Sequence, residues 1–239
     1  AVARDSAGNT ATASSVTVLV SNVTASVNPI AHWTLDTADI SGSTILDKSG
    51  NGNNGTASNI DTTTFFTTGR IGQALKFDGV DDYIQTSSAT VKNLSNVTIS
   101  VWFNNNVTTP QHMVWEGIST ANGWGNNVGS EPEIHISLGR NNDGTIQNDY
   151  VGVSMGNRGD GTGVNCEVEV PFTDIRRWHH LVGTFSNITT SPSCEMFLDA
   201  VSQGTDTGTV EALDTSGYDT SLRIGRSGVA SRLFNGILD

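Results

Sequence analysis

The 239-residue chain is poor in charge, and above all in positive charge. Charged residues make up 15% of it, and the 12 basic residues, only three of them lysines, face 24 acidic ones for a net charge of −12. So acidic a surface repels phosphate backbones and anionic membranes, which argues against binding of nucleic acid or membrane surfaces. No apolar run approaches the roughly 20 residues of a membrane span. Neither a signal peptide nor a Met opens the chain, so we interpret the N-terminus as processed or cut.

Cysteine is scarce as well, since Cys166 and Cys194 are the only two. Both lie in strand-like segments, on either side of a third such segment at 178–186. A disulfide between them is predicted, closing a loop of roughly 29 residues and contributing about 3 kcal/mol in the chain-entropy model. Two buried free thiols are the alternative.

Asn, Thr, Ser and Gly take the place of the missing charged residues. These residues suit turns and short strands and suit helices poorly. Between residues 30 and 239 about a dozen short strand candidates, the first of them Ile30–Leu35, alternate with Gly/Asn/Asp turns, and no window keeps a helical period for long. The pattern predicts an all-β fold, an antiparallel sandwich of two sheets.

The first 29 residues differ from the rest. Ser14–Val20 alternates polar residues with valines and predicts a half-buried strand, and the preceding Ser6–Asn9 predicts a turn. A hairpin over 1–21 and a polar linker over 22–29 would then lead into one domain over 30–239. The hairpin resembles the end of a bacterial immunoglobulin-like repeat, in which the pattern A-x-D-x-A-G-N precedes the last strand; here it is carried by Ala3 to Asn9. An ordinary edge hairpin is the alternative.

Eight segments, in order, resemble the laminin G-like, concanavalin A-like jelly roll: Trp33–Asp36, Asp47–Gly55, Gly72–Ile84, Val97–Phe103, Trp178–Phe185, Met196–Asp199, Leu222–Arg226 and Phe234–Asp239. The resemblance covers residues 30–239. It implies a two-sheet jelly roll, often with a structural calcium near its loops. It also implies a closing strand beyond Asp239, so we expect the last strand of the domain to be missing.

Oxygen-bearing residues on glycine-containing turns suggest where such a calcium could bind. Calcium takes 6–8 oxygen ligands, and carboxylates are the usual anchors. The predicted ligand region is the Asp81 and Asp239 area, with Asp36 and Asp47 behind it. The alternative is that these residues satisfy the main-chain amides of their own turns.

A glycan site is predicted around two tryptophans outside the strand motifs. Trp124 lies in a loop of Gly and Asn that can bury little, and an exposed indole there is costly unless it binds something. Trp33, Trp102 and Trp178 are expected in the core. The predicted ligand-binding residues are Trp124, Trp115, Asn126, Glu131, His135 and Arg140, with His112 and Glu116 lining the same region. The alternative is that Trp124 folds back and plugs its loop.

Catalysis is not expected. Glu167 and Glu169 share one face of a strand, as do Glu131 and Glu133, but such pairs more often mark a solvent face than a glycosidase site. We predict a non-catalytic, extracellular binding or adhesion module that recognises glycans or surface and matrix proteins. One alternative is a structural subunit or spacer, with self-association through the N-terminal strand. The other is an accessory domain of a polysaccharide-degrading enzyme.

Overall fold

The computed structural model describes residues 2–4, 10–12, 29–117, 132–142, 145–157, 164–207, 221–227 and 232–239. Strands β1 (Val2–Arg4) and β2 (Thr10–Thr12) pair with each other as a two-stranded antiparallel hairpin. The predicted strand Ser14–Val20 lies outside the described residues. The immunoglobulin-like assignment of the hairpin and the domain boundaries stay predictions.

The remaining strands form two antiparallel sheets. The large sheet has nine strands in the order β13-β12-β11-β10-β17-β8-β5-β4-β3. Along the chain these are β3 (Ile40–Ser41), β4 (Thr44–Ile45), β5 (Gly55–Ser58), β8 (Tyr83–Thr86), β10 (Gln111–Gly117), β11 (Pro132–Asn142), β12 (Thr145–Asn157), β13 (Val164–Pro171) and β17 (Arg223–Ile224).

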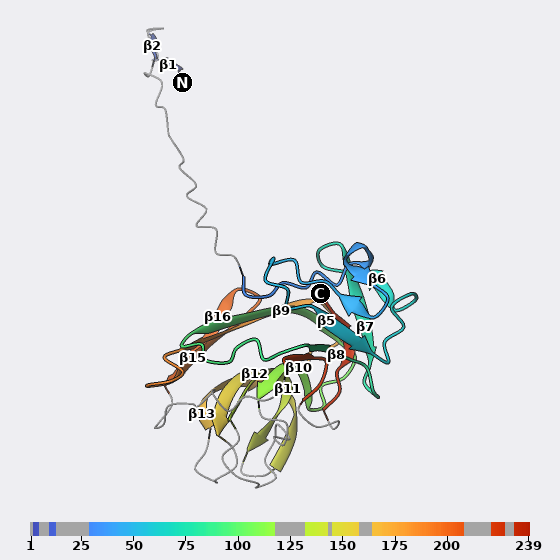
Figure 1. Cartoon of the computed structure of the whole chain (residues 1–239). Coiled ribbons are helices and arrows are strands. Elements are labelled where there is room, and N and C mark those ends of the chain that lie inside the picture. Colours follow the sequence, from blue (N-terminus) through green and yellow to red (C-terminus); the bar gives the residue numbers. More distant parts are fainter. Residues whose placement is uncertain are drawn as a thin grey trace.

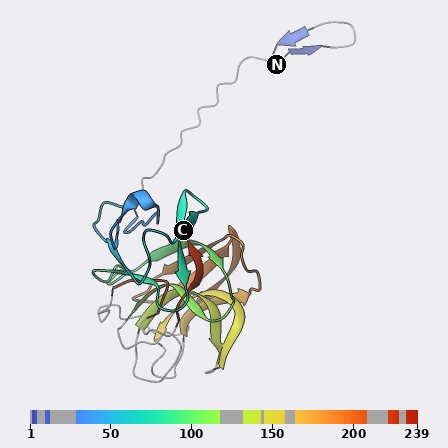
Figure 2. The same cartoon turned by 90° about the vertical axis from the view of Figure 1, so that its right-hand side faces the viewer.

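The small sheet has seven strands in the order β16-β15-β14-β9-β18-β7-β6. They are β6 (Phe66–Thr68), β7 (Gln73–Asp78), β9 (Val97–Asn105), β14 (His179–Ser186), β15 (Ser193–Leu198), β16 (Val201–Thr207) and β18 (Asn235–Leu238). Figure 1 shows this sheet arching over β10–β13. Asp239 follows β18 and lies against the domain (Figure 2).

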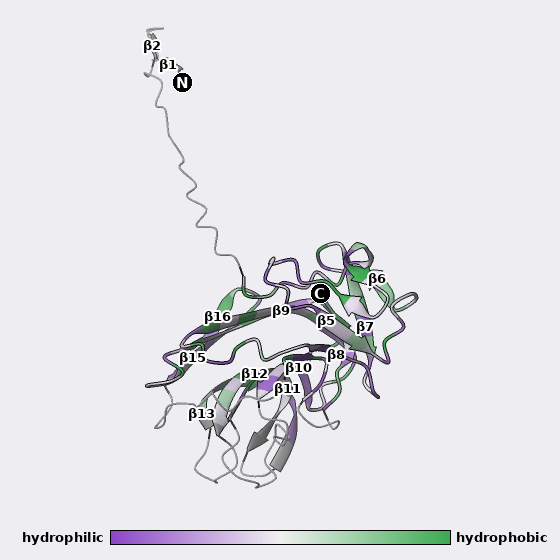
Figure 3. Ribbon diagram, viewed as in Figure 1, coloured by the Kyte–Doolittle hydropathy of each residue, from purple (hydrophilic) through white to green (hydrophobic). Residues whose placement is uncertain are grey.

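The period of two along each strand divides core from surface. On β11, Ile134, Ile136 and Leu138 are buried in the core between the sheets, so the residues between them point to the opposite face. Figure 3 shows the same alternation as green and purple along the ribbons. The predicted all-β, two-sheet sandwich is confirmed.

The predicted disulfide is also confirmed. Cys166 on β13 and Cys194 on β15 are bonded, with their Cα atoms 5.9 Å apart, and both are buried. Because β13 belongs to the large sheet and β15 to the small one, the bond ties the two layers together at one side of the core.

One predicted strand is wrong. Residues 30–35 are assigned to no strand, because side chains of the following loop take up their main-chain groups. The Nδ2 atoms of Asn51 and Asn53 both donate to the Ile30 carbonyl oxygen, and Oδ1 of Asp47 accepts the His32 N–H. The described residues contain one helical segment, the three-residue 3-10 helix η1 (Thr37–Asp39), which is too short to cross a membrane.

Candidate functional site

A row of mainly polar side chains crosses seven strands of the large sheet on the face turned away from the small sheet. The row is set by strand register, since each member is the direct partner of the next. In order from β5 to β13 it contains Thr56, Gln85, Arg223, Trp115, His135, Ser154 and Glu167. We call this set the polar row. Directly opposite residues in antiparallel strands have Cβ atoms about 5 Å apart, so neighbouring members can interact.

Contacts around Trp115 hold the centre of the polar row together. Its indole N–H donates to Oε2 of Glu133 at 3.0 Å, and Oε1 of the same carboxylate lies 3.5 Å from Nδ1 of His135. The His112 and His135 rings meet edge to face with centroids 4.7 Å apart. The Arg223 guanidinium carbon lies 5.4 Å from the centre of the Trp115 ring. An aromatic ring, a carboxylate, two imidazoles and a guanidinium are thus gathered on one face.

Burial divides the polar row into a covered centre and accessible flanks. Trp115 and His135 are 0% exposed, and Glu133 and Ser154 are 2% exposed. Gln85 and Arg223 on one side of the centre, and Glu167 on the other, are half-buried. These flanking side chains are the members that an external molecule could touch, and one of them, Arg223, packs on the Trp115 ring of the centre.

The structure brings some of the predicted glycan-site residues together. Trp115 and His135 are direct partners in the ladder between β10 and β11. Arg140 lies farther along β11, beyond a register shift, and the structure describes only its main chain. Trp124, Asn126 and Glu131 lie outside the described residues, within the connection from β10 to β11.

Two sequence-based expectations need correction. Trp115 offers no exposed ring for a sugar to stack on, because the indole is completely buried. Glu116 points to the opposite face of β10 from Trp115, where its two oxygens accept the N–H groups of Thr90 and Val91, each at 2.8 Å. Burial raises the pKa of this carboxyl and these hydrogen bonds lower it. Burial has the larger effect, so the pKa is raised to about 7.

Sequence reasoning missed several members of the polar row. Arg223 and Ser154 each sit between two apolar residues that point into the core, and Gln85 sits between the core residue Ile84 and the buried Thr86; that alternation is a signal of outward position. Glu133, which lies beside the row on the same face, likewise alternates with the core residue Ile134. The pattern could not show that they share one row, because register across non-consecutive strands is a tertiary property.

The three tryptophans expected in the core are all half-buried. Trp33 packs against the core and donates its indole N–H to the Asn53 carbonyl oxygen at 2.9 Å. Trp102 instead lies on the outer face of the small sheet, stacked on His180 with ring centroids 4.6 Å apart. It pairs in register with His180, which explains the stack.

The predicted metal ligands fall into separate places. Asp81 belongs to a cluster with Asp78 and Asp82 that could hold a metal ion, with one oxygen from each within 4.8 Å of the others. Burial first, and then the charges of Asp78 and Asp81, raise the pKa of Asp82. Asp239 lies at the other end of the β7–β18 ladder, because Asn235 pairs with Asp78 and Leu238 with Leu75. Asp81 and Asp239 therefore cannot share one ion.

The other two predicted ligands are engaged with main-chain amides. Asp47 accepts the N–H groups of His32, Ser49 and Asn53, each at 2.9 Å; burial raises its pKa but these bonds lower it overall. Asp36 accepts the Gln73 N–H at 2.6 Å. The contacts of Asp47 with Ser49 and Asn53 match the alternative of a carboxylate that satisfies its own turn, whereas Asp36 binds the amide of a distant strand.

Comparison with known proteins identifies the family of this chain. The family described as the concanavalin A-like lectin/glucanases superfamily matches residues 78–239. No curated protein matches the chain.

Among solved structures, domain 4 of AbnA, a GH43 extracellular arabinanase from Geobacillus stearothermophilus in complex with arabinotriose, is 18% identical, with a TM-score of 0.57 over 88% of both chains. A Trypanosoma rangeli sialidase mutant displaying trans-sialidase activity is 12% identical, with a TM-score of 0.50 over 85% of this chain and 30% of that one. The CBM40 of a Ruminococcus gnavus sialidase, bound to α2,3-sialyllactose, is 15% identical, with a TM-score of 0.47 over 70% of this chain and 88% of that one. These likenesses concern the fold alone. The family match, which covers more than half of the chain, shows that the chain belongs to the concanavalin A-like lectin/glucanases superfamily.

Proposed function

We propose that this chain is a non-catalytic carbohydrate-binding module of an extracellular protein, and that the polar row is the floor of its glycan-binding face. The observation that carries the proposal is the register that aligns Gln85, Arg223, Trp115, His135 and Glu167 across one face. Sugar recognition needs donors and acceptors held at fixed positions on a largely preformed surface. The contacts of the covered centre supply that rigidity.

The accessible flanks provide the hydrogen-bonding groups. Arg223 has five N–H donors in a rigid fork, one of which is held by the Ser227 carbonyl oxygen at 3.0 Å. Gln85 adds a donor and an acceptor on one side, and Glu167 and Glu169 add acceptors on the other. We further propose that the connection from β10 to β11 contributes Trp124 as the aromatic platform, with Asn126, Glu131 and Arg140 as hydrogen-bonding neighbours.

The expected ligand is a neutral oligosaccharide. A net charge of −12 disfavours polyanionic glycans through long-range repulsion. Domain 4 of the arabinanase AbnA, which shares the fold, was solved with arabinotriose, a neutral sugar. The disulfide between Cys166 and Cys194 fits an oxidising extracellular compartment.

We also propose that calcium binds at Asp78, Asp81 and Asp82. Three carboxylates are the hard oxygen donors that calcium prefers, and carbonyl oxygens and water could complete its shell. The site fits a cation because Asp82 is only 2% exposed and lies against two like charges, whose repulsion a divalent ion would relieve. Its role would be structural, since the cluster lies on the turn between β7 and β8.

Calorimetric titration with a panel of neutral and sialylated oligosaccharides tests the glycan proposal. Arabino-oligosaccharides or another neutral member should bind, and Arg223→Ala should weaken binding about tenfold or more, as expected for loss of a hydrogen-bonded charged group. The matched control is Arg177→Ala, which removes a guanidinium that is 75% exposed and lies on the turn before β14. A folded protein that binds no glycan at millimolar concentration, or that binds equally well without Arg223, would contradict the proposal.

A further inference from the structure

Six accessible side chains gather at the end of the polar row that lies over β5, β8 and β17. Three of them belong to the row, and the other three lie beside it on the same face, where Ser58 pairs with Tyr83 two residues farther along the strands. All six are half-buried or exposed. We call this set the arginine flank; it consists of Thr56, Ser58, Tyr83, Gln85, Arg223 and Arg226.

A glycine turn brings Arg226 onto this face. Arg223 points outward and Ile224 points into the core, so strict alternation would turn the residue after Gly225 inward again. The φ of +86° at Gly225 interrupts that alternation. The guanidinium carbon of Arg226 consequently lies 4.3 Å from the centre of the Tyr83 ring, which is a cation–π distance.

The two arginines are anchored to one main-chain oxygen. Nη1 of Arg223 and Nε of Arg226 donate to the Ser227 carbonyl oxygen at 3.0 and 3.3 Å, and Ser227 is 0% exposed. Each guanidinium also lies over an aromatic ring, Arg223 over Trp115 and Arg226 over Tyr83. A guanidinium is planar and holds its N–H donors in a rigid fork, so two groups fixed in this way present donors at fixed positions. Such donors suit the hydroxyl oxygens of a sugar.

The arginine flank is closed at one end and continues at the other. Trp115 and His135, the next members of the polar row, are 0% exposed, so a sugar chain lying on this flank cannot continue across the row. In the opposite direction Thr44 on β4 and Ser41 on β3 extend the line of Thr56 to the edge of the sheet, and both are accessible. Neighbouring strands lie about 5 Å apart, which gives this line a length of roughly 20 Å from β17 to β3.

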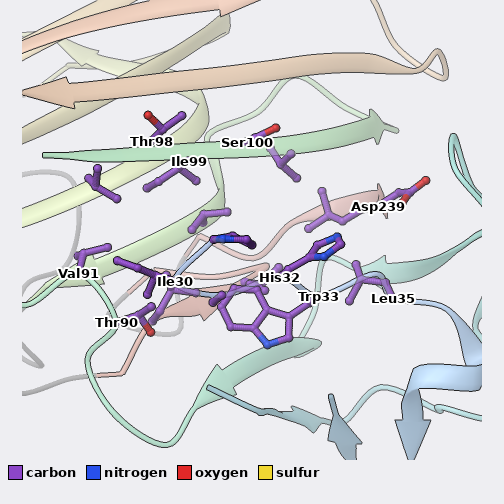
Figure 4. Close-up of a pocket in the computed structure, with 18 of the residues that line it drawn as sticks. Ile30, His32, Trp33, Leu35, Thr90, Val91, Thr98, Ile99, Ser100 and Asp239 are labelled. Atoms are coloured by element: carbon purple, nitrogen blue, oxygen red, sulfur yellow. The ribbon is translucent and has the colours of Figure 1, made fainter. Parts of the chain in front are cut away.

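A cavity on the opposite side of the large sheet is mainly apolar. It has a volume of about 460 Å³, and its lining includes Val114 and Ile224, which are inward residues of β10 and β17. Figure 4 shows the side chains of Ile99 and Trp33 in the same lining. Sugar hydroxyl groups need hydrogen-bonding partners, so the arginine flank suits a glycan better than this cavity does.

We propose that the glycan-binding face takes the end of a neutral sugar chain, seated on the arginine flank. This inference rests on the proposed function and specifies which part of the polar row performs it. The terminal sugar unit lies against Arg223 and Arg226, where the buried centre of the row stops the chain. The following units continue over Thr56 toward Thr44 and Ser41. An internal stretch of a polysaccharide does not fit, because it would have to continue across the buried centre.

Calorimetric titration with sugar chains of two lengths tests the recognition of an end. The probes are arabino-, xylo- and cello-oligosaccharides of three and six units, added to the full chain. A chain end offers one register whatever its length, so both lengths of the series that binds should bind one per protein, with affinities within about twofold of each other. A site for three internal units would find four registers on a hexasaccharide, which raises the affinity about fourfold, and could load two proteins on one chain. That result would overturn the proposal.

Substitutions on the arginine flank locate the chain end. Arg226→Ala removes a charged hydrogen-bond donor and should weaken binding of the trisaccharide about tenfold. Tyr83→Leu removes the ring beneath the guanidinium, so it should bind more weakly than Tyr83→Phe, which keeps that ring. Gln85→Ala is a second test on the neighbouring strand if Arg226→Ala does not fold. Arg177→Ala is the matched control and should bind as the parent does, and circular dichroism checks that each variant is folded.

The outcomes separate this inference from the proposed function. Absence of binding in every series at millimolar concentration would contradict both. If Glu167→Gln weakens binding more than Arg226→Ala and Gln85→Ala do, the sugar lies on the other flank; the inference would then be wrong, while the glycan-binding face would stand. Binding that none of these substitutions changes would show that the sugar does not lie on the polar row, and would contradict both again.

Discussion

The carboxylate of Glu116 accepts the main-chain N–H of Val91 at 2.8 Å, from a side chain that is 1% exposed. Its second oxygen accepts the N–H of Thr90 at the same distance. The glutamate thereby ties β10 to the stretch that follows β8. A carboxylate so placed is desolvated in its charged form, and the burial raises its pKa to about 7.

This contact predicts a dependence of stability on pH. Because the pKa of Glu116 is higher in the folded than in the unfolded chain, its contribution is fully present below about pH 4.5 and is lost as the pH rises through 7. The loss amounts to at most about 3 kcal/mol. Glu116→Gln mimics the protonated acid and should lack this loss. In urea unfolding, the free energy of unfolding of the variant should therefore rise relative to that of the parent between pH 5 and 8.

The control is Glu195→Gln, the same change at a half-buried glutamate on β15, which should keep the parent's pH profile. Parallel profiles of the parent and Glu116→Gln across this range would show that Glu116 does not titrate there.

A close approach at Gly225 makes a second prediction. Gly225 has a φ of +86°, and a Cβ there would lie 2.7 Å from the ring of Phe77, which is buried. Gly225→Ala should therefore cost both backbone strain and displacement of a core side chain, together about 2–4 kcal/mol. Gly50 has nearly the same φ, +88°, with nothing within 4 Å of the added Cβ.

Gly50→Ala should consequently cost only the strain, about 1–2 kcal/mol. The difference between the two free energies of unfolding, measured in urea, isolates the clash with Phe77. Equal losses would mean that Phe77 moves aside without cost.

Calcium should stabilise the protein through the aspartate cluster. If calcium binds the folded chain alone, a concentration 100 times the Kd adds about 2.7 kcal/mol and raises the melting temperature. Asp81→Asn removes one charged ligand and should reduce that rise. Asp174→Asn, the same change on the turn before β14, should leave it intact. Equal responses of all three proteins to calcium, measured by calorimetry with a chelator as baseline, would place the ion elsewhere.

Much of the fold could be predicted from local pattern. Alternating residues such as those of Val97–Phe103 identify strands, Gly and Asn mark the turns, and the ordered segments from Trp33 to Asp239 resemble one family of sandwiches. The disulfide could be expected from two cysteines in strand-like segments. Residues 30–35 show the limit, because their apolar pattern suits a strand but Asn51 and Asn53 occupy the carbonyl group of Ile30.

The candidate site was predictable only in fragments. Trp115 and His135 were singled out by residue type, and their pairing confirms that they lie together, but nothing local indicated that Trp115 is buried. The prediction from sequence places Asp81 and Asp239 in one ligand region. The antiparallel pairing of β18 with β7 puts them at opposite ends of a ladder instead.

The sequence by itself determined the class of fold, because strand period, turn residues and apolar content act over a few neighbouring residues. It also determined the acidity that disfavours anionic partners and the supply of polar side chains on outward positions. Only the tertiary structure decided which of those side chains meet. The polar row joins residues from Thr56 to Arg223 through strands that are not consecutive along the chain. Register between distant strands depends on how the two layers pack, and no short stretch of sequence contains it.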